Sequence, residues 1–158
     1  MTSPIYLALV MHNHQPVGQF DFVNEHAVRV AYEPLLDLLE RHPSVACAIH
    51  FTGSLLDYLV AQQRPLLERV RALVARGQLE VLSGGYYEPL LTTLPDADKI
   101  GQIHKLSAAV EDVFGMRPRG MWLAERVWEP HLVRAIAEAG IEYVIIDDTH
   151  FEAVGYDR

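Results

Sequence analysis

The chain has a single cysteine and no long hydrophobic run. Cys47 stands alone among 158 residues, so neither a disulfide framework nor a cysteine-based zinc site can form within the chain. The apolar stretch IYLALVM has no basic region before it and leads directly into HNHQP, a pattern that fits neither a signal peptide nor a membrane span. We therefore expect a cytoplasmic protein with no membrane partner.

Positive charge is also scarce. The sequence has 13 Lys and Arg residues against 21 Asp and Glu residues, which gives a formal net charge of −8. An acidic surface without basic clusters repels a phosphate backbone, so nucleic acid is not expected as a partner. Half of the residues are apolar and 22% are charged, as in a globular domain with a buried core. The length fits one domain over residues 1–158, or a piece of one.

Short apolar runs alternate with longer amphipathic runs, and the step of about thirty to forty residues is typical of βα units. The expected strands are nearly continuous in apolar residues, as in a sheet covered on both faces. They span residues 5–11, 45–51, 78–82, 120–124 and 142–147. The expected helices span residues 24–41, 54–75 with an interruption near Pro65, 96–114 and 130–139. Gly77 and Gly140 are expected to end two of them, because glycine accepts the left-handed conformation of a C-terminal cap. Strands joined by helices must lie parallel, which predicts an α/β fold, either a doubly wound sheet or part of a barrel.

Polar and aromatic residues collect where each expected strand ends, in HNHQP, HFTGS, SGGYYEP, AERVWEP and DDTHF. Sites in parallel α/β folds lie at these carboxyl ends. His12 and His14 are two positions apart, so in extended geometry their imidazoles point to the same side. This spacing indicates contact with a polar ligand, a metal pair or a solvated strand end. His50 and His150, at other strand ends, keep the metal alternative open.

Several carboxylates occupy unusual positions. Glu80 lies inside the third expected strand, where a carboxylate is costly unless it is paired or used, or unless the strand is at an edge. Glu88 follows two tyrosines, and aromatic rings beside a carboxylate suit a sugar or peptide groove, although the tyrosines could also fold the loop down. Asp147 and Asp148 form an acidic pair that suits a cation, a sugar hydroxyl or a capped turn.

The segment WLAERVWEP places Glu125 between Trp122 and Trp128. We expect this carboxylate to reach a cleft walled by both indoles, with Arg126 holding it ionised. Attack on an anomeric carbon requires such a carboxylate. The alternative is a surface Glu–Arg pair beside a structural tryptophan.

In their order and spacing, HNHQP, GQLEVL and WLAERVWEP resemble the first three sequence regions of glycoside hydrolase family 57. The run ERVWEP is most similar to the subgroup of 4-α-glucanotransferases and related α-amylases. The resemblance implies a retaining α-glucan enzyme on an incomplete (β/α)7 barrel, of which this chain supplies the N-terminal part, about five βα units. It also implies an α-glucan or maltooligosaccharide substrate, and neither a metal nor an organic cofactor.

By this resemblance Glu125 is the catalytic nucleophile. The other positions that it assigns to the substrate are Trp122, His12, His14, Glu80, Glu88 and Asp148. The tryptophan lines the donor subsite, the two histidines and Glu80 contact the glycosyl unit, and the other two carboxylates belong to the cleft wall.

The family's general acid is an aspartate in a fourth region on a later strand, and the chain reaches YDR before that region. Retaining hydrolysis needs two carboxyl groups about 5 to 5.5 Å apart. The resemblance therefore predicts negligible glucan activity for the 158-residue polypeptide alone. An incomplete set of barrel strands also has an open edge and an uncovered apolar face, through which the polypeptide can self-associate.

Two other functions remain open. One is a metal-dependent hydrolase of the polysaccharide-deacetylase type, with His12, His14 and Asp148 as ligands. The other is a non-catalytic glucan-binding remnant of the same fold, which keeps the aromatic walls and lacks the chemistry.

Overall fold

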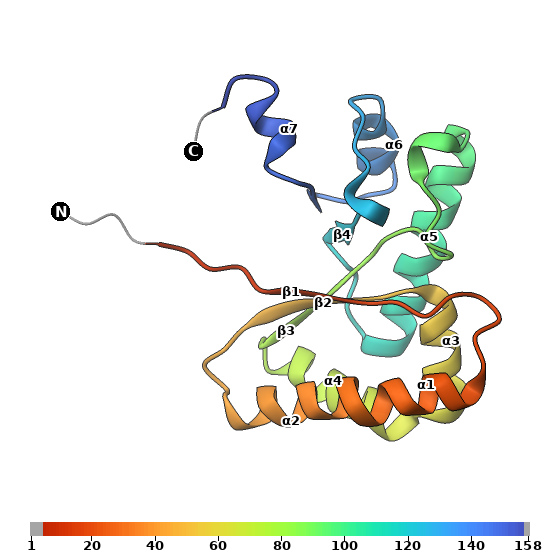
Figure 1. Ribbon diagram of the computed structural model, residues 1–158, viewed down its shortest axis with the longest axis vertical. Helices are drawn as coiled ribbons and strands as arrows, with labels where there is room; N and C mark the ends of the chain where they lie inside the picture. Colours follow the sequence, from red (N-terminus) through yellow and green to blue (C-terminus); the bar gives the residue numbers. More distant parts are fainter. Residues whose placement is uncertain (1–4, 157–158) are drawn as a thin grey trace.

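The computed structural model describes residues 5–156, which form five parallel strands with helices packed against them (Figure 1). Residues 1–4 and 157–158 of the expected domain lie outside the described residues. The strands are β1 (Val10–Asn13), β2 (Cys47–Phe51), β3 (Leu79–Leu82), β4 (Gly120–Trp122) and β5 (Tyr143–Ile145).

The strands follow one another in space in the order of the chain. β1 pairs with β2, β2 with β3, and β4 with β5, all in parallel. A parallel bridge between Ser83 and Met121 joins the two groups, and the amide of Trp122 donates a hydrogen bond of 2.8 Å to the carbonyl of Ser83. These pairings confirm the predicted α/β class with parallel strands, and the arrangement is that of part of a barrel.

Helices cover the outward face of the strands. Figure 1 shows α1, α2 and α4 lying along β1 to β3, with α5 and α6 nearer to β4. The helices are α1 (Asp21–Ala27), α2 (Glu33–Arg41), α3 (Gly53–Gln62), α4 (Arg64–Ala75), α5 (Asp96–Phe114), α6 (Leu132–Glu138) and α7 (Thr149–Glu152), with a π-helical turn η1 (Val28–Tyr32) and short 3-10 turns η2 (Leu91–Thr93) and η3 (Ala124–Arg126). None of these helices is long and apolar enough to cross a membrane.

Two hydrophobic clusters hold the helices to the strands. The larger one packs Ile49 and Val81, which are 2% and 0% exposed, against α1 to α5. The smaller one packs Met121 and Leu123 against α6 and the first half of α5. Because alternate strand residues are committed to these clusters, the intervening residues, including His12 and His50, point to the opposite, concave side.

The first strand differs from the expectation of residues 5–11. It begins at Val10 and continues to Asn13, and the exposed fractions of Ile5, Tyr6 and Leu7 are 96%, 90% and 80%. The physical reason is that residues 5–8 have no strand to pair with among the described strands. Hydrogen bonding to β2 starts only where the amide of Ala48 donates to the carbonyl of Leu9.

Two further boundaries are corrected. The helix expected from residue 24 begins at Asp21 and contains the π-helical turn η1 just before Pro34, whose missing N–H cannot continue the regular ladder. The strand expected over residues 120–124 ends at Trp122, because the chain turns sharply in η3. The other strands and α6 are each shorter than expected by one to three residues.

Several local predictions are confirmed. The interruption expected near Pro65 occurs at Gln63, between α3 and α4, and α5 has the expected bounds. Gly77 and Gly140, expected as helix stops, have φ of 73° and 82°, the left-handed conformation of a C-terminal cap.

Candidate active site

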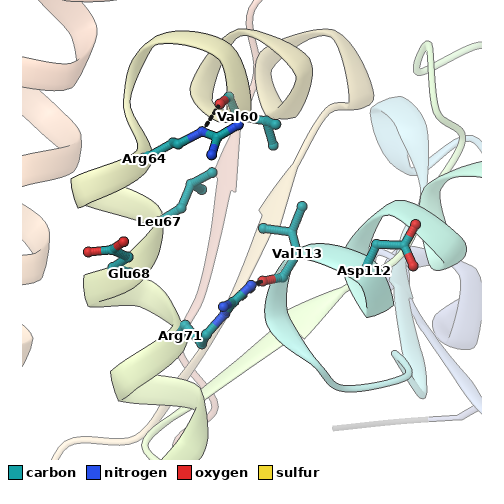
Figure 2. A pocket seen from close by; sticks show the side chains of 7 residues that line it. All are labelled: Val60, Arg64, Leu67, Glu68, Arg71, Asp112 and Val113. Carbon is teal, nitrogen blue, oxygen red and sulfur yellow. Dashed lines mark hydrogen bonds between the residues drawn. The ribbon is translucent and has the colours of Figure 1, made fainter.

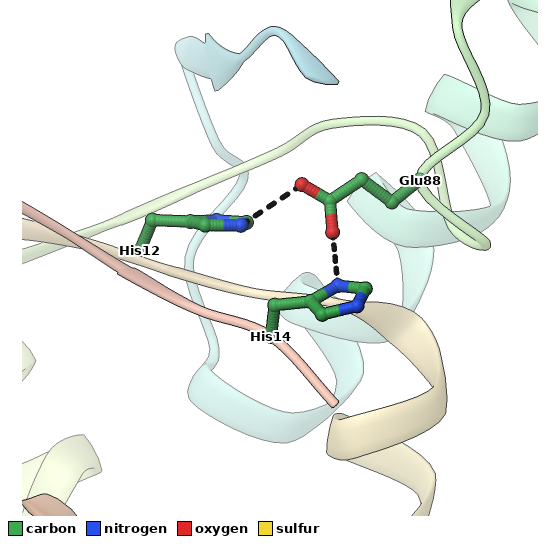
Figure 3. Close-up of side chains that lie close together, drawn as sticks. All are labelled: His12, His14 and Glu88. Carbon is green, nitrogen blue, oxygen red and sulfur yellow. Dashed lines mark hydrogen bonds and ion pairs between the residues drawn. The ribbon is translucent and has the colours of Figure 1, made fainter. Parts of the chain in front are cut away.

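Two histidines at the end of β1 share one carboxylate (Figure 3). Nε2 of His12 lies 2.9 Å from Oε1 of Glu88, and Nδ1 of His14 bonds to Oε2 of the same side chain. Glu88 comes from the loop after β3, 74 positions along the chain from His14. The expected same-side orientation of the two imidazoles is thus confirmed. Glu88, expected only in the wall of the cleft, lies at the centre of the cluster.

A third histidine continues this chain of hydrogen bonds. Nδ1 of His12 lies 2.9 Å from Nδ1 of His50, its partner in the register between β1 and β2. When neutral His12 donates from Nε2 to Glu88, its Nδ1 can only accept, so Nδ1 of His50 is the donor. Nε2 of His50 then carries no proton, and this buried atom has no hydrogen-bond partner among the described residues. His50 therefore selects the tautomer that directs the N–H of His12 at Glu88.

Burial decides the charge of His50. The side chain is 1% exposed, and burial, assisted by the nearby His12 imidazole, lowers the pKa of His50 to about 3. His50 is therefore a neutral hydrogen-bonding group at physiological pH. The sequence indicated His50 only as part of a metal alternative, although its position at a strand end beside His12 was a usable signal.

Glu88 remains the charged member of the cluster. Burial raises the pKa of this carboxyl, but the hydrogen bond from His12 and the positive potential of the neighbouring imidazoles outweigh burial, so the pKa of Glu88 lies below its ordinary value. A negative centre held by two imidazoles can accept hydrogen bonds from sugar hydroxyls and orient the ring edges that face a ligand.

The indole of Trp122 stacks on the imidazole of His12. Their ring centroids are 4.5 Å apart and the planes are inclined by 13°. Nε1 of Trp122 is buried and has no hydrogen-bond partner among the described residues. The indole thus fixes the plane of His12 from the end of β4 and presents a polar edge within the cluster.

A strained turn presents Glu125 just after β4. Apart from glycines, the residues with positive φ in the described chain are Glu88, Glu125 and Arg126, at 54°, 51° and 52°. Each such conformation costs about 1 to 2 kcal/mol for a residue with a Cβ atom. All three lie in the segments that follow β3 and β4, so the fold tolerates strain at the strand ends around the cluster. The carboxylate of Glu125 is exposed and makes no hydrogen bond or ion pair within residues 5–156.

The two expected neighbours of Glu125 have different outcomes. Nε of Arg126 donates to Oδ1 of Asp147 at 2.6 Å, because successive left-handed residues turn the guanidinium toward the end of β5. Arg126 therefore does not hold Glu125. Trp128 is partly buried and packs against the smaller hydrophobic cluster, and its role as a second wall of the cleft stays a prediction.

Glu80 is not brought to the histidine cluster. It pairs in register with Ala48, two residues before the level of His50, a separation of about 6 to 7 Å along the strand. Its carboxylate accepts a hydrogen bond from the hydroxyl of Tyr143, and burial, assisted by this hydrogen bond, raises the pKa of that hydroxyl. Glu80 therefore lies one layer below the cluster on the same concave face.

Asp148 is exposed at the start of α7 and is not a member of the group formed by His12, His14 and Glu88. In the described chain the side chains whose ligand atoms lie within 4.8 Å of one another are His12, His14 and Glu88. These two imidazoles and one carboxylate form a donor set that suits a divalent transition metal. The structure thus places Glu88, and not Asp148, where a third ligand would lie.

The two tyrosines before Glu88 have different roles. Tyr86 is 5% exposed, its hydroxyl donates to Asp57 at 2.6 Å, and its ring packs so closely on Gly53 that a Cβ atom there would lie 2.4 Å from the ring. Tyr87 is 49% exposed. The alternative of a loop folded down by its tyrosines therefore holds for Tyr86 and not for Tyr87.

A cavity of about 380 Å³ lies on the helical side of the fold, between α4 and α5 (Figure 2). Nε of Arg71 crosses it and donates to the carbonyl of Val113 at 2.9 Å, which ties α4 to the end of α5. Glu68 and Asp112 are its acidic lining residues. The cavity includes none of the residues at the strand ends, so we assign it to helix packing.

Comparison with known proteins places this arrangement in a family. The chain is 53% identical over 155 residues to alpha-amylase 1 of Dictyoglomus thermophilum, covering 98% of this chain and 23% of the relative. It is 43% identical over 148 residues to a 4-alpha-glucanotransferase of Thermococcus kodakarensis, covering 94% and 22%. The crystal structure of 4-alpha-glucanotransferase from Thermococcus litoralis superposes with a TM-score of 0.91 at 40% identity, over 96% of this chain and 24% of that one.

The chain thus spans about a quarter of the length of the relatives that it matches. The sequence model of glycosyl hydrolase family 57 matches residues 8–158, which is nearly the whole chain. Together with the parallel strands and the cluster at their ends, this match shows that the chain belongs to glycosyl hydrolase family 57.

Proposed function

We propose that this chain carries the nucleophile and the glycosyl-binding histidines of a retaining enzyme that acts on α-1,4-glucans, of the 4-α-glucanotransferase or α-amylase type. Membership of the family and relatives named alpha-amylase and 4-alpha-glucanotransferase support an α-glucan substrate. The polar groups on the concave face, with Trp122 among them, also suit a sugar.

The observation that carries the proposal is the turn at Glu125. Its backbone is held at a φ of 51° directly after β4. Its carboxylate is exposed and makes no hydrogen bond or ion pair within residues 5–156. Strain of this kind persists only where the surrounding structure imposes it, and it concentrates at functional sites. Sites of parallel α/β folds lie at the carboxyl ends of the strands, which supports the proposal that this free carboxylate reacts with a ligand on the concave face.

In the proposed reaction a Glu125 oxygen attacks the anomeric carbon of the bound glucan. The bond from that carbon to the glycosidic oxygen breaks, and the leaving oxygen takes a proton from a general acid. We propose that this acid comes from residues outside the 158-residue chain. The resulting ester on Glu125 is then cleaved by water, which gives hydrolysis, or by a sugar hydroxyl, which gives transfer.

The remaining groups position the sugar. We propose that the edges of His12 and His14 contact hydroxyls of the reacting glycosyl unit, while Glu88 fixes both rings and Trp122 lines the donor subsite. Glu80 contacts the same unit from the layer below, through a carboxylate that Tyr143 holds. Asp148 belongs to the cleft wall.

The test is a kinetic comparison of variants in the full open reading frame that encodes this chain. Glu125→Gln keeps the size of the side chain and removes the nucleophile, so turnover of maltooligosaccharides is expected to fall by about three or more orders of magnitude. Glu129→Gln is the matched control, because Glu129 is an exposed glutamate four residues away whose carboxylate pairs with His131. Equal activity in Glu125→Gln and wild type contradicts the proposal, and glucan binding without turnover in the wild type indicates a non-catalytic remnant.

A further inference from the structure

A second cavity lies beside the histidine cluster, in the loop that continues from His14. Its volume of about 360 Å³ falls within the range of small-molecule sites, about 300 to 1,000 Å³. Its polar lining residues include Gln15, Gln19, Asn24 and Asp57, and Tyr87 closes one side. Gln15 directly follows His14 and Tyr87 directly precedes Glu88, so two segments of the cluster extend into this cavity.

Tyr87 is held as a rigid aromatic wall. Nζ of Lys105 donates to its hydroxyl at 2.6 Å and lies 4.4 Å from its ring centroid. The ring of Tyr86 packs against it edge to face, at 4.9 Å, and the amide of Tyr87 donates to Oε1 of Gln102 at 3.0 Å. Half of the side chain is nevertheless exposed. A fixed and accessible ring suits the apolar face of a sugar, because little freedom is lost on binding.

Asn24 belongs to the polar lining of the same cavity. The residue is 5% exposed, and its Oδ1 atom is buried with no hydrogen-bond partner among residues 5–156. Buried polar atoms in folded proteins nearly always have a partner, so an unsatisfied side-chain amide in the lining of a cavity indicates a polar ligand there. A sugar hydroxyl can supply the missing hydrogen bond.

Several other polar side chains of the cavity are already ordered. Nε2 of Gln19 donates to Oε1 of Gln15 at 3.2 Å, and the hydroxyl of Ser54 donates to the carbonyl of Gln15 at 2.7 Å. Asp57 accepts from Tyr86 and is fixed in the same way. The lining therefore combines one aromatic face with oriented amides and a carboxylate, which is the composition of a carbohydrate site and not of a purely apolar pocket.

We propose that this cavity is an additional glucan subsite, which holds a glucosyl unit of the same chain whose reacting unit lies at the Glu88 cluster. The proposal rests on the proposed function, because it takes the ligand to be an α-1,4-glucan. The ring of Tyr87 stacks on one face of this unit, and the side-chain amide of Asn24 forms a hydrogen bond with one of its hydroxyls. A longer oligosaccharide then binds more tightly than a short one.

The test is a titration of the 158-residue chain with maltoheptaose, followed by amide and imidazole NMR signals. Signals of Gln15, Gly18, Asn24 and Tyr87 are expected to shift saturably together with those of His12 and His14. Tyr87→Ala is expected to weaken the binding reported by the cavity signals by about tenfold. Tyr87→Phe, which retains the ring, and Tyr156→Ala, which removes an exposed tyrosine elsewhere, are expected to bind as wild type does. A thermal melt checks that each variant is folded.

The outcomes separate this inference from the proposed function. Shifts at His12 and His14 without shifts around Tyr87, or unchanged affinity in folded Tyr87→Ala, overturn the additional subsite and leave the proposed function in place. Shifts around Tyr87 alone support the subsite and count against the assigned role of the histidines. If maltoheptaose moves neither set of signals, the additional subsite is wrong, and the proposed function is decided by the kinetics of the full-length variants.

Discussion

The imidazole of His12 lies flat against the indole of Trp122, with ring centroids 4.5 Å apart. The two residues come from β1 and β4, which are not neighbours in the strand order. Their contact therefore crosses the concave side of the strands, as the curvature of a barrel requires. This crossing brings the two separate sequence motifs HNHQP and WLAERVWEP into one site.

The first prediction concerns the carboxylate between the histidines. Glu88→Gln keeps the shape of the side chain, but its amide nitrogen is a donor and faces an imidazole N–H. We expect kcat/KM of the full-length enzyme to fall by about a hundredfold, because the imidazoles lose their orientation. Glu138→Gln, at an exposed position on α6, serves as the control. If Glu88→Gln stays within about twofold of wild type, the positioning role is wrong.

The second prediction is a loss of stability in mild acid. The folded chain keeps His50 neutral down to a pKa of about 3, whereas the unfolded chain binds a proton near the ordinary value of 6.5. Between these values the unfolded state holds more protons, so the free energy of unfolding rises with pH and falls on acidification. From pH 6.5 to pH 5 we expect a loss of about 1.5 kcal/mol from this residue.

Urea unfolding at both pH values measures this loss. His50→Gln cannot take up the proton and is expected to show a shallower dependence on pH. His42→Gln, at an exposed loop position, retains His50 and is expected to keep the wild-type dependence. If the free energy of unfolding changes equally with pH in His50→Gln and in wild type, His50 is not the group responsible.

Periodicity and turn chemistry predicted the local structure well. The apolar runs located all five strands, and the bounds of α5 and the caps at Gly77 and Gly140 were correct, since each depends on neighbouring residues. Residues 5–9 were misassigned because an apolar run shows that burial is favourable and does not show which strand will cover it. The pattern contains no information about a partner.

The composition of the site was predictable, but its pairings were not. The motifs indicated His12, His14 and Trp122, yet the bond between His14 and Glu88 joins residues 74 positions apart. Adjacency in sequence predicts that Arg126 pairs with Glu125, whereas the left-handed turn directs Arg126 to Asp147. Such partners depend on backbone direction after each strand, which no local pattern specifies.

The third prediction compares two glycines. A Cβ atom at Gly53 would lie 2.4 Å from the buried ring of Tyr86, whereas one at Gly101, within α5, meets no atom within 4 Å. Gly53→Ala is expected to destabilise the fold by about 1 to 3 kcal/mol through overpacking. Gly101→Ala is expected to stabilise it by about 0.5 to 1 kcal/mol, because alanine favours the helix. The free energy of unfolding in urea measures both changes. If the two substitutions change it in the same direction, the prediction is wrong.

The fourth prediction concerns the exposed apolar segment before β1. Ile5 and Leu7 are 96% and 80% exposed beside a strand whose other edge has no partner among the described strands. Such edges pair with other chains, so we expect the 158-residue polypeptide to self-associate as its concentration rises in sedimentation velocity. The double variant Ile5→Lys, Leu7→Lys is expected to remain monomeric, whereas Val133→Lys, on α6, is expected to associate as wild type does. A wild-type monomer at all concentrations would refute this prediction.

The central claim is that Glu125 forms a covalent bond to the sugar. The most direct measurement is mass spectrometry of the enzyme from the full open reading frame after reaction with a slowly hydrolysed fluorinated α-glucosyl donor. We predict a glycosyl mass increment on the peptide that contains Glu125, and no increment in Glu125→Gln. A label on another carboxylate, such as Glu129 or Asp147, or turnover with no covalent adduct, would contradict the assignment of Glu125 as nucleophile.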